Sequence, residues 1–157
     1  MERKPITKKG YKNLQEELKN LIKTDRPKII SDIEEARAHG DLKENAEYHA
    51  AKERQSFIET RIQQLNFLVA NSEVIDISKI NSDQVRFGAT VTYEDINSGE
   101  TVSWKIVGEE ESNIEAKEIS IQSPIARALL GKEEGDDVTI KVPRGEIEVE
   151  IKSVKYL

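Results

Sequence analysis

The 157-residue chain is 36% apolar, 34% charged and 5% aromatic, with a net charge of −6 and no cysteine. This composition suits a long, solvated helical part joined to a compact domain, and the length allows one large or two small domains. It excludes a disulfide framework and a thiolate metal site. No apolar run approaches the roughly 18 residues that span a membrane, so we expect a soluble, cytoplasmic protein without membrane contact.

Charge is distributed unevenly along the chain. Residues 1–76 carry 14 basic and 14 acidic side chains, whereas residues 77–157 carry ten basic and 16 acidic ones. Within the first part, residues 8–30 are mostly basic and residues 32–47 are mostly acidic. Acidic surfaces repel nucleic-acid phosphate unless a cation lies between them. Ordinary DNA binding through residues 32–47 is therefore disfavoured.

Apolar residues at three- and four-residue spacing predict a long first helix, with Thr7 as its N-cap, that ends at His39. The spacing slips in phase near Ile22, and Pro27 interrupts the pattern. Proline removes a backbone donor and clashes with the preceding turn. We therefore expect either a kink at Pro27 or a break that Asp25 caps again.

A second helix follows Gly40, which is the usual residue type for a C-terminal cap. Its apolar residues are alternately three and four positions apart, the pattern of a coiled-coil seam. Two such helices joined by a few residues fold back as an antiparallel pair. The predicted seam residues are Tyr48, Ala51, Gln55, Ile58, Ile62, Leu65 and Val69.

Beyond Asp76 the pattern changes to short alternating runs separated by turn residues, which predict an antiparallel sheet. Ser123, Pro124 and Gly131 mark the start and end of one short covering helix, and the acidic run 109–111 is expected to be a loop. We predict an α+β fold with two domains, an antiparallel coiled-coil hairpin over residues 1–76 and the sheet domain over residues 77–157. The expected strands are 85–93, 102–106, 119–121, 138–142 and 147–151.

The segment between the two helices carries Asp41 and Glu44, for which two compatible interpretations exist. Their spacing is that of a capping box, and acids suit the positive end of the second helix. Alternatively, the two carboxylates present oxygens to Mg²⁺. Two carboxylates on an exposed turn make an incomplete Mg²⁺ site, so a partner would have to supply the other ligands.

Lys52 and Arg54 follow this segment and form a small basic spot. Such a pair is usually part of a solvated helix face, and contact with nucleic acid is the sharper alternative. His39 and His49 lack the spacing of a helical zinc pair, and the sequence shows no Ser/His/Asp pattern and no glycine-rich phosphate loop.

The run Ala36–Glu53 closely resembles the tip of the bacterial GreA/GreB transcript-cleavage factors. It is more similar to the GreA type than to the GreB type, whose arm carries a larger basic patch. The resemblance covers nearly the whole chain. Further matching motifs are Ile6-Thr7 with Gly10 and Leu14, Arg26-Pro27, Phe87–Val91, Ile106–Gly108 and Ser123–Leu129.

The resemblance implies that the hairpin enters the secondary channel of RNA polymerase and that the C-terminal domain, FKBP-like in fold, docks at the rim. Asp41 and Glu44 would help hold the second catalytic Mg²⁺, so that the polymerase cleaves the 3′ end of backtracked nascent RNA. Lys52 matches the basic position that meets the RNA 3′ end, and Arg54 is a second candidate for this contact. We expect a monomeric factor that is not an enzyme and has no cofactor of its own, because the Mg²⁺ belongs to the polymerase.

Three other functions stay open. A Gre-like inhibitor would enter the same channel without activating cleavage, although Asp41 and Glu44 argue against it. A coiled-coil chaperone or scaffold would use the acids of the tip only as caps. A prolyl isomerase is disfavoured by the sparse aromatic residues, and an FKBP-like fold does not fix function.

Overall fold

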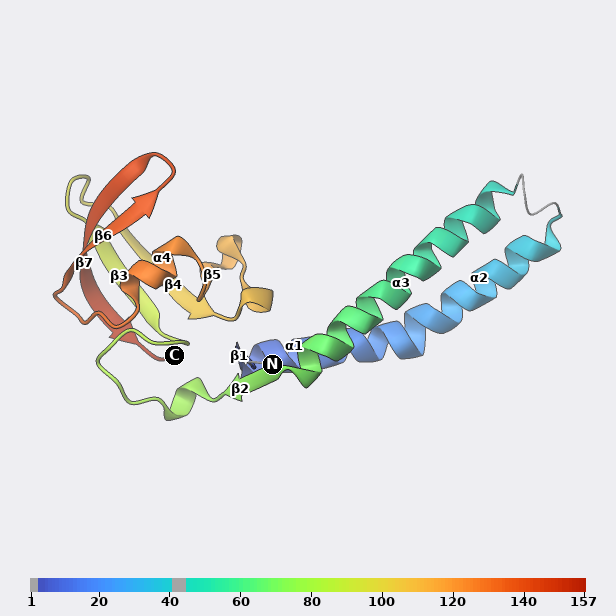
Figure 1. Ribbon diagram of the computed structural model, residues 1–157, viewed down its shortest axis with the longest axis horizontal. Coiled ribbons are helices and arrows are strands. Elements are labelled where there is room, and N and C mark those ends of the chain that lie inside the picture. The colour runs from blue at the N-terminus through green and yellow to red at the C-terminus, as the bar shows by residue number, and fades with distance from the viewer. Residues whose placement is uncertain (1–2, 41–44) are drawn as a thin grey trace. The chain divides into compact units, whose positions relative to one another are not determined.

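The computed structural model describes residues 3–40 and 45–157, which fold into two compact units (Figure 1). The first unit spans Tyr11–Ser72, and the second comprises the described residues up to Gly10 together with Glu73–Leu157. Within the part of the chain that the structure describes, no helix combines the length and apolarity needed to cross a membrane.

The first arm of the hairpin is a continuous helical path in three pieces. Helix α1 (Lys8–Asn20) leads into a five-residue π turn, η1 (Leu21–Asp25), and then into α2 (Arg26–Ala38). The backbone stays right-handed helical throughout the junction, and the side chain of Asp25 accepts no capping hydrogen bond. The predicted alternative of a break capped again by Asp25 is therefore wrong.

The π turn accommodates Pro27, which lies in the first turn of α2. In a regular α-helix the proline ring would clash with the carbonyl of Lys23, four residues earlier. The N–H of Arg26 instead reaches back five residues to the carbonyl of Leu21, which widens the turn ahead of the proline. A π turn holds one extra residue, so the slip in phase predicted near Ile22 is confirmed.

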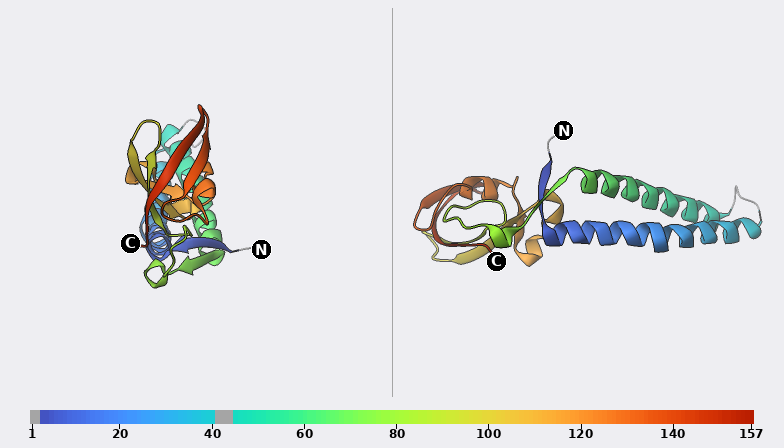
Figure 2. Two further views of the ribbon diagram at one scale, coloured as in Figure 1. Left: turned by 90° about the vertical axis from the view of Figure 1, so that its left-hand side faces the viewer. Right: turned by 90° about the horizontal axis from the view of Figure 1, so that it is seen from below.

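The second arm is α3 (Ala46–Ala70), which lies beside α2 along its length and runs in the opposite direction (Figures 1 and 2). Every one of the seven predicted seam residues is buried or half-buried, so the seam is confirmed. Ile29 and Ile33 of α2 pack with Ala51 of α3, and Tyr48 and Ile58 flank this cluster.

Forked ion pairs join the two arms beside the seam. Arg61 donates to both carboxylate oxygens of Glu17 at 2.7 and 3.0 Å, and Arg26 donates to those of Glu59 at 2.8 and 2.9 Å. Donation by Arg61 holds the pKa of Glu17 below its ordinary value, and Arg26 does the same for Glu59. All four side chains are partly exposed, so each pair contributes little energy, but the two-point geometry fixes how the arms align.

The second unit is built on a five-stranded sheet with the strand order β5-β4-β3-β7-β6 and one helix, α4 (Pro124–Leu129). The α+β class, a sheet of five strands and the short helix are confirmed. The first strand begins at Thr90 and not at Val85, because a turn at Phe87 and Gly88, closed by the N–H of Ala89 on the carbonyl of Arg86, precedes it. The pairing of β5 with β4 is parallel, while the other three are antiparallel. This happens because two 3₁₀ turns, η3 (Glu109–Glu111) and η4 (Ile114–Ala116), bring the chain back before β5 begins. The strands are β3 (Thr90–Asp95), β4 (Thr101–Val107), β5 (Glu118–Ser120), β6 (Asp137–Val142) and β7 (Gly145–Lys155).

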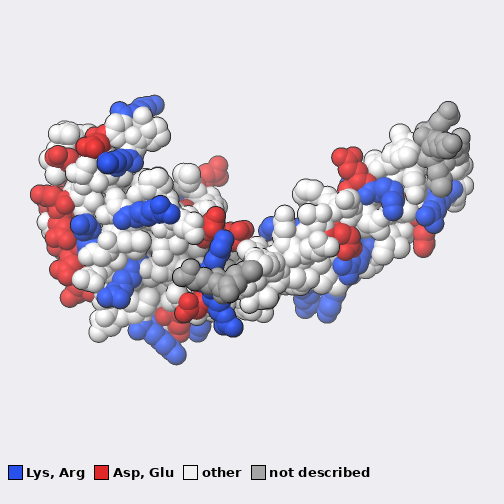
Figure 3. Space-filling model, viewed as in Figure 1, with Lys and Arg blue, Asp and Glu red and all other residues white. Residues whose placement is uncertain are grey.

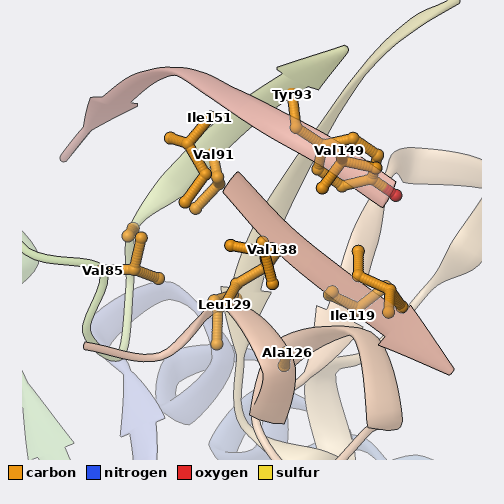
Figure 4. Packing of buried hydrophobic residues seen from close by; sticks show 12 residues of the cluster. Val85, Val91, Tyr93, Ile119, Ala126, Leu129, Val138, Val149 and Ile151 are labelled. Carbon is orange, nitrogen blue, oxygen red and sulfur yellow. The ribbon is translucent and has the colours of Figure 1, made fainter. Parts of the chain in front are cut away.

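The core of the second unit lies between α4 and one face of the sheet (Figure 4). Ala126 and Leu129 of α4 are fully buried and belong to the same cluster as Val149 and Ile151 of β7. The hydroxyl of Ser123 accepts the N–H of Ala126 at 3.2 Å, which confirms the predicted cap. The opposite face of the sheet is polar, in keeping with the alternation along each strand.

Two short strands lie outside this sheet. Strand β1 (Lys4–Thr7) pairs with β2 (Ser72–Ile75), and a 3₁₀ turn, η2 (Ile77–Lys79), follows β2. The hydroxyl of Thr7 accepts the N–H of Gly10 at 3.1 Å, which confirms Thr7 as the N-cap of α1.

Acidic side chains gather along the left-hand margin of the second unit, where β7 runs (Figure 3). Glu146, Glu148 and Glu150 alternate along this strand on the polar face, and only Lys152 forms ion pairs with Glu150 and Glu94 among the described residues of that face. This acidic face of β7 repels nucleic-acid phosphate.

Candidate functional site

The two acids of greatest interest, Asp41 and Glu44, lie outside the described residues, so the site is built from what flanks them. On the N-terminal side, α2 ends at Ala38 with His39 as its C-cap. Gly40 has a φ of +127° and its N–H points to the carbonyl of Arg37 at 3.5 Å. A side chain would be strained at this φ, so the predicted role of Gly40 in ending the first arm is confirmed.

On the C-terminal side, Asn45 organises the start of α3. Its side-chain oxygen accepts the N–H of Tyr48 at 3.1 Å, the bond that defines an N-cap. Its side-chain nitrogen donates to the carbonyl of Ala36 in α2 at 2.6 Å. One side chain therefore caps the second arm and ties it to the last turns of the first.

This geometry corrects one interpretation of the sequence. The N-cap of α3 is Asn45, so the capping-box interpretation that gave this role to Asp41, with Glu44 three residues later, is wrong. The sequence offers two residue types that favour N-caps, Asp and Asn, and only the observed start of the helix at Ala46 distinguishes them. Capping of α3 consequently gives no reason for an acid at position 41.

A shallow hollow between α2 and α3 lies close to these caps. It is lined by three alanines and four charged residues: Ala36, Ala50, Ala51, Asp32, Glu35, Glu47 and Arg54. The guanidinium of Arg54 lies 3.9 Å from the carboxylate of Asp32. Arg54 thus shares the lining of the hollow with Asp32, Glu35 and Glu47, three of the acids that the sequence places near the tip.

Lys52 and Arg54 do not form one basic spot. Residues two apart on an α-helix point about 200° away from each other, and the two side chains have different partners. Arg54 faces Asp32 of α2, whereas the amine of Lys52 donates to Gln55 of its own helix at 3.2 Å. Their contact with nucleic acid stays a prediction, now with different surroundings for each.

The described residues do not by themselves make a metal site. Within residues 3–40 and 45–157, no three His, Asp or Glu side chains lie close enough together to hold a metal ion. Carboxylate oxygens are nonetheless the ligands that Mg²⁺ prefers, so Asp41 and Glu44 are the right residue types for a site that a partner completes.

Comparison with known proteins identifies the family. The model of the N-terminal region of the GreA and GreB transcription elongation factors matches residues 4–74, and the model of their C-terminal region matches residues 80–156. The chain belongs to the GreA/GreB family of transcription elongation factors. The resemblance seen in the sequence is confirmed.

Individual GreA proteins are similar over their full length. Transcription elongation factor GreA of Anaeromyxobacter sp. (strain K) is 54% identical over 157 residues, covering 100% of this chain and 95% of that protein. GreA of Hyphomonas neptunium is 53% identical over 156 residues, covering 99% of each. The crystal structure of GreA factor homolog 1 of Thermus thermophilus is 26% identical and covers 98% of this chain and 99% of that one, with a TM-score of 0.45.

For this member of the GreA/GreB family, sequence reasoning missed two structural residues. Asn45 belongs to the residue types with the strongest N-cap preference, so its residue type was a usable signal. Glu111 accepts hydrogen bonds from Thr7, 104 positions earlier, and nothing in the acidic run 109–111 distinguishes it from its neighbours.

Proposed function

We propose that this GreA/GreB-family chain enters the secondary channel of RNA polymerase and stimulates cleavage of the 3′ end of backtracked nascent RNA, which rescues arrested elongation complexes. The observation that carries the proposal is the family match over residues 4–74 and 80–156. The chain is not the enzyme in this proposal. It donates side chains to a reaction that the polymerase performs.

The hairpin is suited to reaching a distant site. Helix α3 has 25 residues, which at 1.5 Å per residue gives about 37 Å. An isolated helix of ordinary composition frays in water, but here the seam and the pairs Arg61–Glu17 and Arg26–Glu59 hold two arms together. The paired arms can therefore present the segment that contains Asp41 and Glu44 far from the base of the hairpin.

The ends of that segment are held by Gly40 and Asn45. Because Asn45 supplies the cap of α3, the carboxylates of Asp41 and Glu44 are proposed as ligands donated to the polymerase. When bound, the second Mg²⁺ of the polymerase would activate the attacking water and stabilise charge on the phosphate. The chain would contribute oxygen ligands at fixed spacing, and the polymerase would contribute the rest of the site.

Lys52 is the stronger of the two candidate RNA contacts. Its amine is exposed and bonds only to the neutral amide of Gln55 among the described residues, a partner that an RNA phosphate can replace at little cost. Arg54 already faces the carboxylates around the hollow, which would repel a phosphate. We therefore assign the RNA 3′ end to Lys52 first.

The test is RNA cleavage in a backtracked polymerase complex with Mg²⁺, comparing wild type, Asp41→Asn, Glu44→Gln and no added factor. Glu53→Gln is the matched control, because Glu53 is an exposed carboxylate of the same hairpin. Binding to polymerase is measured in parallel. Changes even next to metal ligands typically cost about 10–100-fold, so both tip variants should lose at least about tenfold in rate while still binding.

Each result has a defined meaning. If wild type and Asp41→Asn bind and neither accelerates cleavage, the chain is a channel inhibitor. If wild type and both variants cleave equally fast, the tip carboxylates are not donated ligands. If wild type does not bind polymerase, the proposed function is wrong.

A further inference from the structure

Glu111 holds the N-terminal segment of the chain within the second unit. Its carboxylate accepts the N–H of Thr7 at 3.0 Å and the N–H of Gly108 at 2.9 Å, and it also accepts the hydroxyl of Thr7. Thr7 is only 5% exposed, so these polar groups would lack water if the carboxylate were removed. The acidic run that the sequence suggested was a simple loop therefore contains a buried contact.

The contact completes a capping box between residues distant in the sequence. In an ordinary capping box, a Glu at the third helical position accepts the N–H of the N-cap residue. The third position of α1 is Gly10, and the first turn contains no acid, only Lys8 and Lys9. Glu111 takes the place of that missing Glu, and its charge suits the positive end of the helix.

Two glycines make room for this arrangement. A Cβ at Gly10 would overlap the carboxyl group of Glu111, whose atoms are its three nearest neighbours. A Cβ at Gly108 would lie 2.6 Å from the carbonyl oxygen of Pro5, closer than real side chains approach. Glycine at both positions lets residues 5–10 lie directly against the turn that carries Glu111.

Further contacts hold the same segment. Lys4 pairs with Glu109 at 3.1 Å, and Lys8 pairs with Asp76 at 3.0 Å. Ile6 is 3% exposed. The backbone of Lys4–Thr7 also pairs with β2. Ion pairs with partly exposed side chains contribute little energy, so among the described side-chain contacts of this segment the hydrogen bonds of Glu111 are the main polar attachment.

We propose that Glu111 is a positioning residue for RNA cleavage. Helix α1 begins in the second unit and continues past Gly10 into the hairpin that carries Asp41 and Glu44. Glu111 holds the first turn of this helix, so its removal would loosen the attachment of the same helix that continues into the hairpin. This inference rests on the proposed function, because it concerns delivery of the same donated carboxylates.

The decisive variants separate the tether from the cap. Glu111→Ala removes both. Glu111→Ala combined with Gly10→Glu restores a local capping box, since Thr7 and a Glu at position 10 then have the required spacing, but it leaves the second unit untethered. Glu110→Ala is the matched control, because Glu110 is an exposed acid of the same turn that makes none of these hydrogen bonds.

Three quantities are measured on the full chain: hydrogen exchange of residues 4–10, binding to backtracked polymerase complexes, and the maximal cleavage rate at saturating factor. Misplacing a reacting group by about 1 Å can cost about a hundredfold. We expect faster exchange and a maximal rate about tenfold to a hundredfold lower for Glu111→Ala, with binding retained. The double variant should keep the low rate, and Glu110→Ala should match wild type.

Two results would overturn the proposal while leaving the proposed function intact. The first is a wild-type maximal rate in Glu111→Ala, and the second is full recovery of the rate in the double variant, which would mean that Glu111 acts only as a cap. A wild-type chain that does not stimulate cleavage at all would overturn both proposals together.

Discussion

Replacing Asn45 with Ala should loosen the start of α3 by a predictable amount. The substitution removes the N-cap bond to Tyr48, which is worth about 1 kcal/mol. It also removes the bond to the carbonyl of Ala36, worth about 1 kcal/mol more. The expected loss is together about 2 kcal/mol, which corresponds to roughly thirtyfold more frequent opening of the first turns of α3.

Hydrogen exchange of residues 46–51 measures this opening directly. Asn45→Asp is the informative comparison, since its carboxylate keeps the cap of Tyr48 but cannot donate to Ala36. It should lose about half as much free energy as Asn45→Ala. Protection within twofold of wild type in Asn45→Ala would refute the assignment of Asn45 as the cap and tie of the tip.

Three further predictions concern the core of the second unit, an ion pair of the hairpin and the titration of Asp76. Ile151 is fully buried in the core, so Ile151→Ala should lower the free energy of unfolding in urea, followed by Trp104 fluorescence, by about 2–5 kcal/mol. Lys155 is exposed, so Lys155→Ala should change it by no more than about 0.5 kcal/mol. Equal effects of the two substitutions would contradict the core described above. Arg61 lowers the pKa of Glu17 from 4.5, so this ion pair stabilises the hairpin fully above about pH 4.5 and loses its effect as the pH falls through the lowered pKa. Wild type should therefore lose more stability than Glu17→Gln between about pH 5 and pH 3. Parallel curves of stability against pH would show that the pair is not formed. Hydrogen bonds from Ser78 and Lys8 lower the pKa of Asp76 to about 2. An NMR titration of Asp76 should therefore give a midpoint near 2 in wild type and a higher midpoint in Ser78→Ala. An unchanged midpoint would exclude the Ser78 bond as the main cause.

The arms of the hairpin could be predicted from the sequence because their signals are local and repeated. The seam from Tyr48 to Val69 depends on spacing along one helix, and every member is buried or half-buried as expected. The phase slip near Ile22 was visible for the same reason. Its cause was not, since a proline is compatible with a kink, a break or a π turn, and only the bond from Arg26 to Leu21 distinguishes them.

The contacts that a spacing rule does not cover were missed. Glu111 and Thr7 are far apart in the sequence, so neither carries a local sign of the other. The one available signal was Gly10, which occupies the position where a capping box has an acid. Lys52 and Arg54 are near neighbours in the chain, which suggests one basic spot, although helical geometry alone places them on opposite sides. The parallel strand β5 was missed because alternation gives no strand direction.

The π turn also makes the first arm tolerant of a change in length at one place. Counting heptad positions on from Leu14 and Leu18 leads to 28, 32 and 35, whereas the buried residues beyond the turn are Ile29, Ile33 and Ala36. The arm therefore equals an uninterrupted heptad repeat with a single residue inserted at 21–25. Deleting one residue within 21–25, together with Pro27→Ala, would give a regular α-helix with the seam in register. The same deletion elsewhere in α2 would rotate the following residues by about 100° around the helix axis and expose the seam residues to water.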